Sequence, residues 1–178
     1  MLAVRVGKLY FYKRLKTCGG SGLFAARGIM KGIREYTDVK YISKLKMKNK
    51  YKAIEELAQV FKDSPVCANL DELVTALIER EKIMSTGIGF GIAIPHAKIK
   101  SVKDIAFAIG ISKKGINFDS LDGKPVHLII LVAAGERQHK DYLKLLSRIM
   151  SYLKNEPVRQ RIINAQNSEE IITQFDEE

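Results

Sequence analysis

The sequence predicts an α/β protein, a three-layer α/β/α sandwich in which helices flank a mixed sheet. Helical periodicity up to Lys82, and again after residue 138, encloses short isoleucine- and valine-rich segments that turn signals separate. Helices before and after a group of strands are typical of helices packed on a sheet. With 178 residues, 46% of them hydrophobic, the chain is long enough for one sizeable core, which favours a single globular domain.

The net charge of +10 is concentrated at the N-terminus. Residues 1–34 carry eight basic residues and no acidic one, which leaves 22 basic and 20 acidic residues for positions 35–178. We therefore distinguish a basic N-terminal segment, 1–34, from a nearly neutral domain, 35–178. Three interpretations of the segment compete: a misassigned start upstream of Met30, a flexible or disordered basic arm that contacts lipid or nucleic acid, and a targeting peptide. We favour the first, and no nucleic-acid partner is expected.

Two amphipathic helices are predicted ahead of the strands. Residues 48–64 place apolar side chains on one face at helical spacing, and Pro65 marks the break that follows. Residues 69–82 carry a second apolar stripe, with Asn69 or Asp71 as the start signal. The two stripes consist of Tyr51, Ile54, Leu57, Ala58 and Phe61, and of Leu70, Leu73, Val74, Leu77 and Ile78.

Three strands are predicted in the centre of the chain. They cover residues 88–97, 104–112 and 126–134, all rich in isoleucine and valine. The segments SKKG at 112–115 and LDGKP at 121–125 are the turn signals between them.

The C-terminal third returns to helical spacing. Residues 139–155 place Tyr142, Leu145, Leu146, Ile149 and Tyr152 inward. Pro157 opens another short helix, and a serine N-cap begins the last one in residues 167–175.

Several familiar chemistries are excluded by their missing motifs. The sequence lacks a phosphate-binding GxxxxGK[ST] loop, and GIGFG at 87–91 fails the GxGxxG spacing, so no nucleotide site is indicated. Cys18, Cys67 and the three histidines do not show metal-ligand spacing, so neither a metal nor another cofactor is expected. No apolar run approaches the ~20 residues that cross a bilayer. We therefore expect a soluble, cytoplasmic protein with reduced thiols.

His96 is the first candidate for chemistry. Pro95 fixes its own φ and holds the preceding residue extended, so the strand is expected to end there and present the imidazole at the end of the sheet. Ligands of open α/β sheets tend to bind beyond strand ends. Three alternate glycines, at 87, 89 and 91, allow a backbone or a phosphate to approach closely. A lone histidine at a strand end is more often structural, so the residues alone leave its role open.

Arg80 and His139 strengthen the catalytic interpretation. Arg80 lies at the end of the second predicted helix, where the chain turns back toward the glycine-rich strand. His139 follows the last predicted strand and begins a helix, close to free helical N–H groups. Together with His96 they predict an anion site, and the most plausible anion is a phosphoryl group. Ser85 and Thr86 either donate hydrogen bonds to that group or satisfy the turn into the strand.

At this point the sequence resembles a known family, the enzyme IIA component of the bacterial phosphoenolpyruvate-dependent sugar phosphotransferase system. The resemblance is to the fructose/mannitol type, which includes a nitrogen-regulatory branch. It rests on EREKIMSTGIGFGIAIPHAK, 79–98, on FDSLDGKPVHLIILVAAGERQHKDYLKLLSRI, 118–149, and on the layout from residue 35 onward. The family often has glycine where this chain has Ala97, which is still a small residue.

The resemblance implies roles for these residues and partners. It makes His96 the phosphoacceptor, His139 the histidine that holds the phosphoryl group, and Arg80 the supporting cation, with no metal required. The implied donor is the histidine phosphocarrier protein and the implied acceptor an enzyme IIB, with the membrane reached only through a permease partner. The alternative is a regulatory enzyme IIA whose phosphorylation state controls binding to a transporter or kinase. Which sugar is served, if any, is not predicted.

His127 is interpreted differently. It lies within the apolar segment VHLIIL, so a hydrogen-bonded structural histidine is the favoured interpretation, with a supporting role near the site as the alternative.

Overall fold

The computed structural model describes residues 32–176 of the chain. The predictions made for Met30, for Cys18 and for most of the basic segment therefore lie outside the described residues. At the start of the described range, Ile33 is fully buried in the core. No helix within the described range is long and apolar enough to span a membrane.

The sheet is mixed, as predicted. Its strands run in the order β1-β5-β6-β3-β2, and β4 pairs with β6 beyond the end of β3. The pairs β1–β5, β3–β6 and β4–β6 are parallel, whereas β5–β6 and β2–β3 are antiparallel. The strands are β1 (Ile42–Lys44), β2 (Gly87–Gly89), β3 (Ile92–Ala93), β4 (His96–Ile99), β5 (Ala106–Ile116) and β6 (Val126–Gly135).

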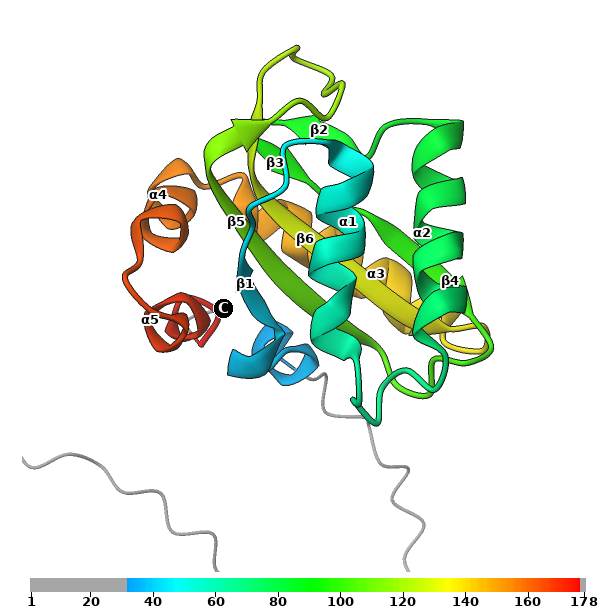
Figure 1. Cartoon of the computed structure of the whole chain (residues 1–178). Coiled ribbons are helices and arrows are strands. Elements are labelled where there is room, and N and C mark those ends of the chain that lie inside the picture. The colour runs from blue at the N-terminus through cyan, green and yellow to red at the C-terminus, as the bar shows by residue number, and fades with distance from the viewer. Residues whose placement is uncertain (1–31, 177–178) are drawn as a thin grey trace, which may run out of the picture. The chain divides into compact units, whose positions relative to one another are not determined.

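Helices cover both faces of this sheet, which confirms the three-layer sandwich (Figure 1). One core cluster joins α1 and α2 to one face, and a second joins α3, α4 and α5 to the other. The helices are α1 (Lys50–Ala58), α2 (Leu70–Ile83), α3 (His139–Leu153), α4 (Glu156–Asn164) and α5 (Ser168–Thr173), with 3₁₀ turns at Ile33–Tyr36, Val39–Tyr41 and Gln59–Phe61.

Among the described helices, α1, α2, α4 and α5 each follow an asparagine, and in three of them its side chain caps the first turn. The side chains of Asn49, Asn69 and Asn167 each accept hydrogen bonds from backbone N–H groups in the first turn of α1, α2 and α5. These bonds satisfy donors that a helix N-terminus otherwise leaves unpaired. The serine cap predicted for the last helix is therefore wrong, because Asn167 caps it and Ser168 is its first residue.

The predicted strand 88–97 is wrong as a single element. Phe90 and Gly91 have φ of 57° and 73°, so the chain reverses there and β2 forms a hairpin with β3. The expectation that the strand ends at His96 is also wrong. Strand β4 begins at His96, where pairing with β6 resumes.

Two further features of the sheet differ from the prediction. The segment 112–115, predicted as a turn, lies inside β5. Its irregularity is a shift in the β5–β6 register, and Gly115 with a φ of 75° accommodates the bend. The short strand β1 was not predicted, because its three residues are too few to show a period.

Candidate functional site

His96 lies at the start of β4 and faces the α3 layer. The residues that alternate with it, Ala97 and Ile99, pack into the core cluster beneath α1 and α2. Because successive side chains in a strand point to opposite faces, His96 and Lys98 point toward α3. There the His96 ring lies 6.0 Å, centroid to centroid, from the ring of Tyr142. The imidazole is half-buried between sheet and helix.

The backbone fixes which ring nitrogen of His96 carries the proton. Nδ1 lies 2.7 Å from the carbonyl oxygen of Ile94. A carbonyl only accepts hydrogen bonds, so Nδ1 is the protonated nitrogen of the neutral ring and Nε2 carries the free lone pair. Ile94 and Pro95 link β3 to β4, and the imidazole of His96 bonds back to the carbonyl two residues before it.

Burial lowers the pKa of His96 from its ordinary value of 6.5. The hydrogen bond to Ile94 opposes this effect, the positive charge of Arg80 adds to it, and the negative charge of Glu81 opposes it. The neutral form, which has the lone pair needed by a nucleophile, is therefore favoured at neutral pH. Since the folded pKa lies below the unfolded one, His96 costs no stability above pH 6.5. It lowers stability as the pH falls through 6.5 toward the folded pKa.

An NMR titration of the His96 ring checks this shift. The midpoint is expected below pH 6.5 in the folded protein, and Arg80→Gln is expected to raise it, because one repelling cation is removed. A midpoint above 6.5, or one that Arg80→Gln lowers, would contradict the electrostatic description of the site.

Arg80 lies in the last turn of α2, close to the same imidazole. Its Nη1 donates to the carbonyl oxygen of Met84, 2.9 Å away, which holds the guanidinium against the end of the helix. Its charge lowers the pKa of His96 and also opposes the rise that burial causes in the pKa of Tyr142. The structure therefore brings Arg80, His96 and Tyr142 within electrostatic reach of one another.

His139 is the first residue of α3, one helical turn before Tyr142. Its Nδ1 lies 3.4 Å from Nζ of Lys98, which shares a face of β4 with His96. A lysine ammonium group only donates, so Nδ1 of His139 accepts and Nε2 carries the hydrogen in the neutral ring. His139 is exposed, so its Nε2–H can donate to an anion bound at the surface. Lys98 adds a cation that was not singled out in the sequence.

Ser85 and Thr86 are engaged within the protein. The Ser85 hydroxyl donates to the carbonyl oxygen of Phe118 and accepts from the N–H of Gly87. The Thr86 hydroxyl donates to a carboxylate oxygen of Glu81 over 2.6 Å, and Thr86 is 4% exposed. A hydroxyl has one proton to donate, and both residues already donate theirs within the protein. This agrees with the second of the two sequence interpretations, in which these hydroxyls form hydrogen bonds at the turn into the strand.

Glu81, which the sequence reasoning passed over, supports the site from inside the fold. It is 1% exposed, and one oxygen accepts from both the N–H and the hydroxyl of Thr86. Its other oxygen lies 3.4 Å from Nζ of Lys50, which also bonds to Asp119 at 2.8 Å. Burial works to lower the pKa of Lys50, but the bond to Asp119 and the charge of Glu81 outweigh it and the pKa is raised. The sequence did offer one sign of this role, because Glu81 is an acidic residue directly after Arg80 in the last turn of α2.

His127 is hydrogen-bonded, as predicted: its Nδ1 lies 2.9 Å from the carbonyl oxygen of Ser112. It lies on β6, where Pro125 and Gly115 are its neighbours. Nothing among residues 32–176 brings three His, Cys, Asp or Glu side chains together in an arrangement that could hold a metal ion.

A comparison with protein-family models matches residues 35–178 to the phosphoenolpyruvate-dependent sugar phosphotransferase system EIIA 2 family. Two curated relatives point to its two branches. The fructose-specific EIIABC component of Bacillus subtilis is 38% identical over 128 residues, which cover 72% of this chain and 20% of that protein's length. A nitrogen regulatory protein of Bradyrhizobium diazoefficiens is 32% identical over 128 residues, 71% of this chain and 82% of the relative.

Among solved structures, the nitrogen regulatory protein IIA-Ntr of Neisseria meningitidis is similar, with a TM-score of 0.75 and 26% identity. The match covers 80% of this chain and 98% of that structure. The chain spans only about a fifth of the Bacillus protein, so the activity of that whole protein does not transfer with the likeness.

Proposed function

Because the chain belongs to the EIIA type 2 family of the phosphoenolpyruvate-dependent sugar phosphotransferase system, we propose that it is a phosphohistidine phosphocarrier. In this proposal His96 accepts a phosphoryl group from the histidine phosphocarrier protein and passes it to an enzyme IIB. The observation that carries the proposal is the bond between Nδ1 of His96 and the Ile94 carbonyl, which leaves Nε2 as the free nucleophile. The name of the Bacillus relative, an EIIABC component, supports an enzyme IIB as the next acceptor.

The proposed step exchanges one P–N bond for another. The Nε2 lone pair attacks phosphorus, the new P–N bond forms as the P–N bond to the carrier histidine breaks, and the carrier nitrogen regains its lone pair. The proton on Nδ1 of His96 stays hydrogen-bonded to Ile94, which stabilises the charge that the phosphorylated ring acquires. Phosphoryl transfer depends mainly on alignment and charge stabilisation, and Arg80 and the Nε2–H of His139 supply these to the phosphoryl oxygens.

His139→Ala tests the supporting role of the second histidine. Losing one donor to a charged group is expected to slow phosphorylation, or to shorten the lifetime of the phosphorylated form, by about 10- to 100-fold. Rates of label uptake and loss measure both effects. His127→Ala is the control: it is expected to alter folding stability and leave the transfer rate near that of the wild type. If His127→Ala slows transfer and His139→Ala alters only folding stability, the roles assigned to the two histidines are reversed.

A regulatory function is the second candidate. The likeness to nitrogen regulatory proteins, including a structure at 26% identity, favours a module whose phosphorylation state controls binding to a transporter or kinase. Incubation with phosphorylated carrier and then with an enzyme IIB separates the two functions. Label that reaches enzyme IIB supports the carrier role, and label that stays on this protein supports regulation.

A further inference from the structure

A notch interrupts the far edge of the sheet, beside β1. Strand β1 pairs with β5 as far as Lys44 opposite Ile111, and the N–H of Leu45 still donates to the carbonyl oxygen of Ile111, 2.8 Å away. Residues 46–48 then leave the edge of β5, and Asn49 returns to it by bridging Asn117. Glu56 of α1 holds them there, because its carboxylate accepts from the N–H groups of Lys46 and Met47 at 3.0–3.2 Å.

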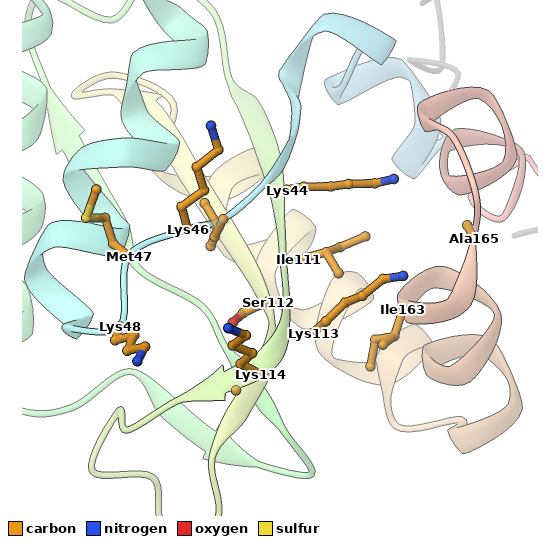
Figure 2. A pocket seen from close by; sticks show the side chains of 12 residues that line it. Lys44, Lys46, Met47, Lys48, Ile111, Ser112, Lys113, Lys114, Ile163 and Ala165 are labelled. Atoms are coloured by element: carbon orange, nitrogen blue, oxygen red, sulfur yellow. The ribbon is translucent and has the colours of Figure 1, made fainter.

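The notch is a cavity of about 400 Å³ that extends to the end of α4 (Figure 2). Its walls are largely apolar, with Leu45, Met47, Ile111 and Ile163 among them. In Figure 2 the side chains of Lys44 and Lys113 extend toward the α4 side, where Ile163 lies. Five lysines line the cavity, all of them exposed residues: Lys44, Lys46, Lys48, Lys113 and Lys114.

These lysines form an unusual concentration of charge. Positions 35–178 hold 22 basic and 20 acidic residues, so the domain as a whole is nearly neutral. Within the described range none of the five ammonium groups lies in an ion pair with a carboxylate. Lys44 donates to the carbonyl oxygen of Gln166, 3.0 Å away, and the neighbouring carboxylate of Glu56 is occupied by backbone N–H groups. Among the residues that the structure describes, no acidic one lines the cavity, so the cavity is a positive region.

Ser112 lines the same cavity and adds a polar group to its wall. The residue as a whole is 4% exposed, but its hydroxyl is not among the fully buried side-chain atoms that lack a partner. A hydroxyl can donate one hydrogen bond and accept others, so an occupant with a polar group beside Ser112 can bond to it.

We propose that this cavity binds a small organic anion that has an apolar body. The apolar walls accept the body, the lysines hold its acidic groups, and Ser112 supplies one further hydrogen bond. The site lies at the opposite edge of the sheet from β4, with β5 and β6 between them, so it is separate from the His96 site.

Other occupants fit these observations less well. The basic segment 1–34 of this chain carries the same charge sign as the lysines, so it is repelled. Single-stranded nucleic acid binds by stacking on aromatic side chains, and none lines this cavity.

Fluorescence titration with 1-anilinonaphthalene-8-sulfonate, a two-ring body with one sulfonate, tests the proposal on the full chain. Saturable binding at one site is expected. N-phenyl-1-naphthylamine, the same body without charge, and inorganic phosphate, charge without the body, are each expected to bind at least about tenfold more weakly. If N-phenyl-1-naphthylamine or inorganic phosphate binds as tightly as the dye, the proposal is overturned. Displacement of the dye by a short DNA duplex would also overturn it.

Three variants locate the binding. Lys113→Glu is expected to weaken dye binding about tenfold. Lys62→Glu, which changes an exposed lysine directly after the 3₁₀ turn Gln59–Phe61, is expected to leave binding unchanged. Ser112→Ala is expected to weaken binding about threefold, because the dye loses one hydrogen bond. No saturable binding, or binding that Lys113→Glu and Ser112→Ala both leave unchanged, overturns the proposal.

Discussion

His96→Gln is expected to abolish phosphorylation by phosphoenolpyruvate and the phosphorylated carrier protein. A glutamine amide has no nucleophilic nitrogen, so the loss of rate is expected to exceed about 10³-fold. The wild type is expected to take up a label that is lost in acid and retained in alkali, which is the stability of a phosphohistidine. Incorporation of radioactive phosphate, followed by acid and alkali treatment, measures both properties.

His127→Gln is the matched control for this experiment. It makes the same substitution in another half-buried histidine, whose Nδ1 bonds to a backbone carbonyl as that of His96 does. The control is expected to retain the label, and circular dichroism verifies that both variants are folded. Undiminished labelling of His96→Gln, or its loss only in His127→Gln, would refute the assignment of the acceptor.

Glu81→Ala is expected to lower the free energy of unfolding by about 3 kcal/mol, because it leaves buried donors without an acceptor. The N–H and the hydroxyl of Thr86, a residue only 4% exposed, both donate to Glu81. Lys50 keeps its bond to Asp119, so the cost comes mainly from Thr86. Urea unfolding followed by circular dichroism measures the change.

Glu55→Ala provides the comparison for Glu81→Ala. Glu55 pairs with Lys52 at 2.7 Å on the surface of α1, and exposed pairs contribute about 0–1 kcal/mol. Unfolding free energies that fall equally in the two variants would show that the buried bonds of Glu81 do not support the turn between α2 and β2.

Much of the fold followed from periodicity and caps. The apolar stripe of residues 69–82 and the Asn69 start signal predicted α2 correctly, and the isoleucine- and valine-rich runs located the sheet. The errors occurred where tertiary contacts override local signals. The segment SKKG resembles a turn, but residues on either side of it pair with β6, so it lies within β5. The hairpin at Phe90 needs a positive φ, which is uncommon for phenylalanine and is not indicated by the sequence.

The charged groups of the candidate site could be proposed from the sequence, whereas the groups that contact His96 and position it could not. Arg80 and His139 stood out because a cation and an imidazole lie at element ends that the topology brings toward His96. Tyr142 was predicted as a core residue, and its place beside the imidazole depends on how α3 crosses the sheet. The Ile94 carbonyl cannot be seen in a sequence pattern, because its orientation comes from the resumption of the strand after Pro95.

The central claim is that Nε2 of His96 receives the phosphoryl group. Phosphorus NMR of the phosphorylated wild-type protein, combined with proton–nitrogen correlation of the His96 ring, identifies the bonded nitrogen. The account predicts a single phosphohistidine with phosphorus on Nε2 and Nδ1 still protonated toward Ile94. Phosphorus bonded to Nδ1, or to another residue, would contradict it.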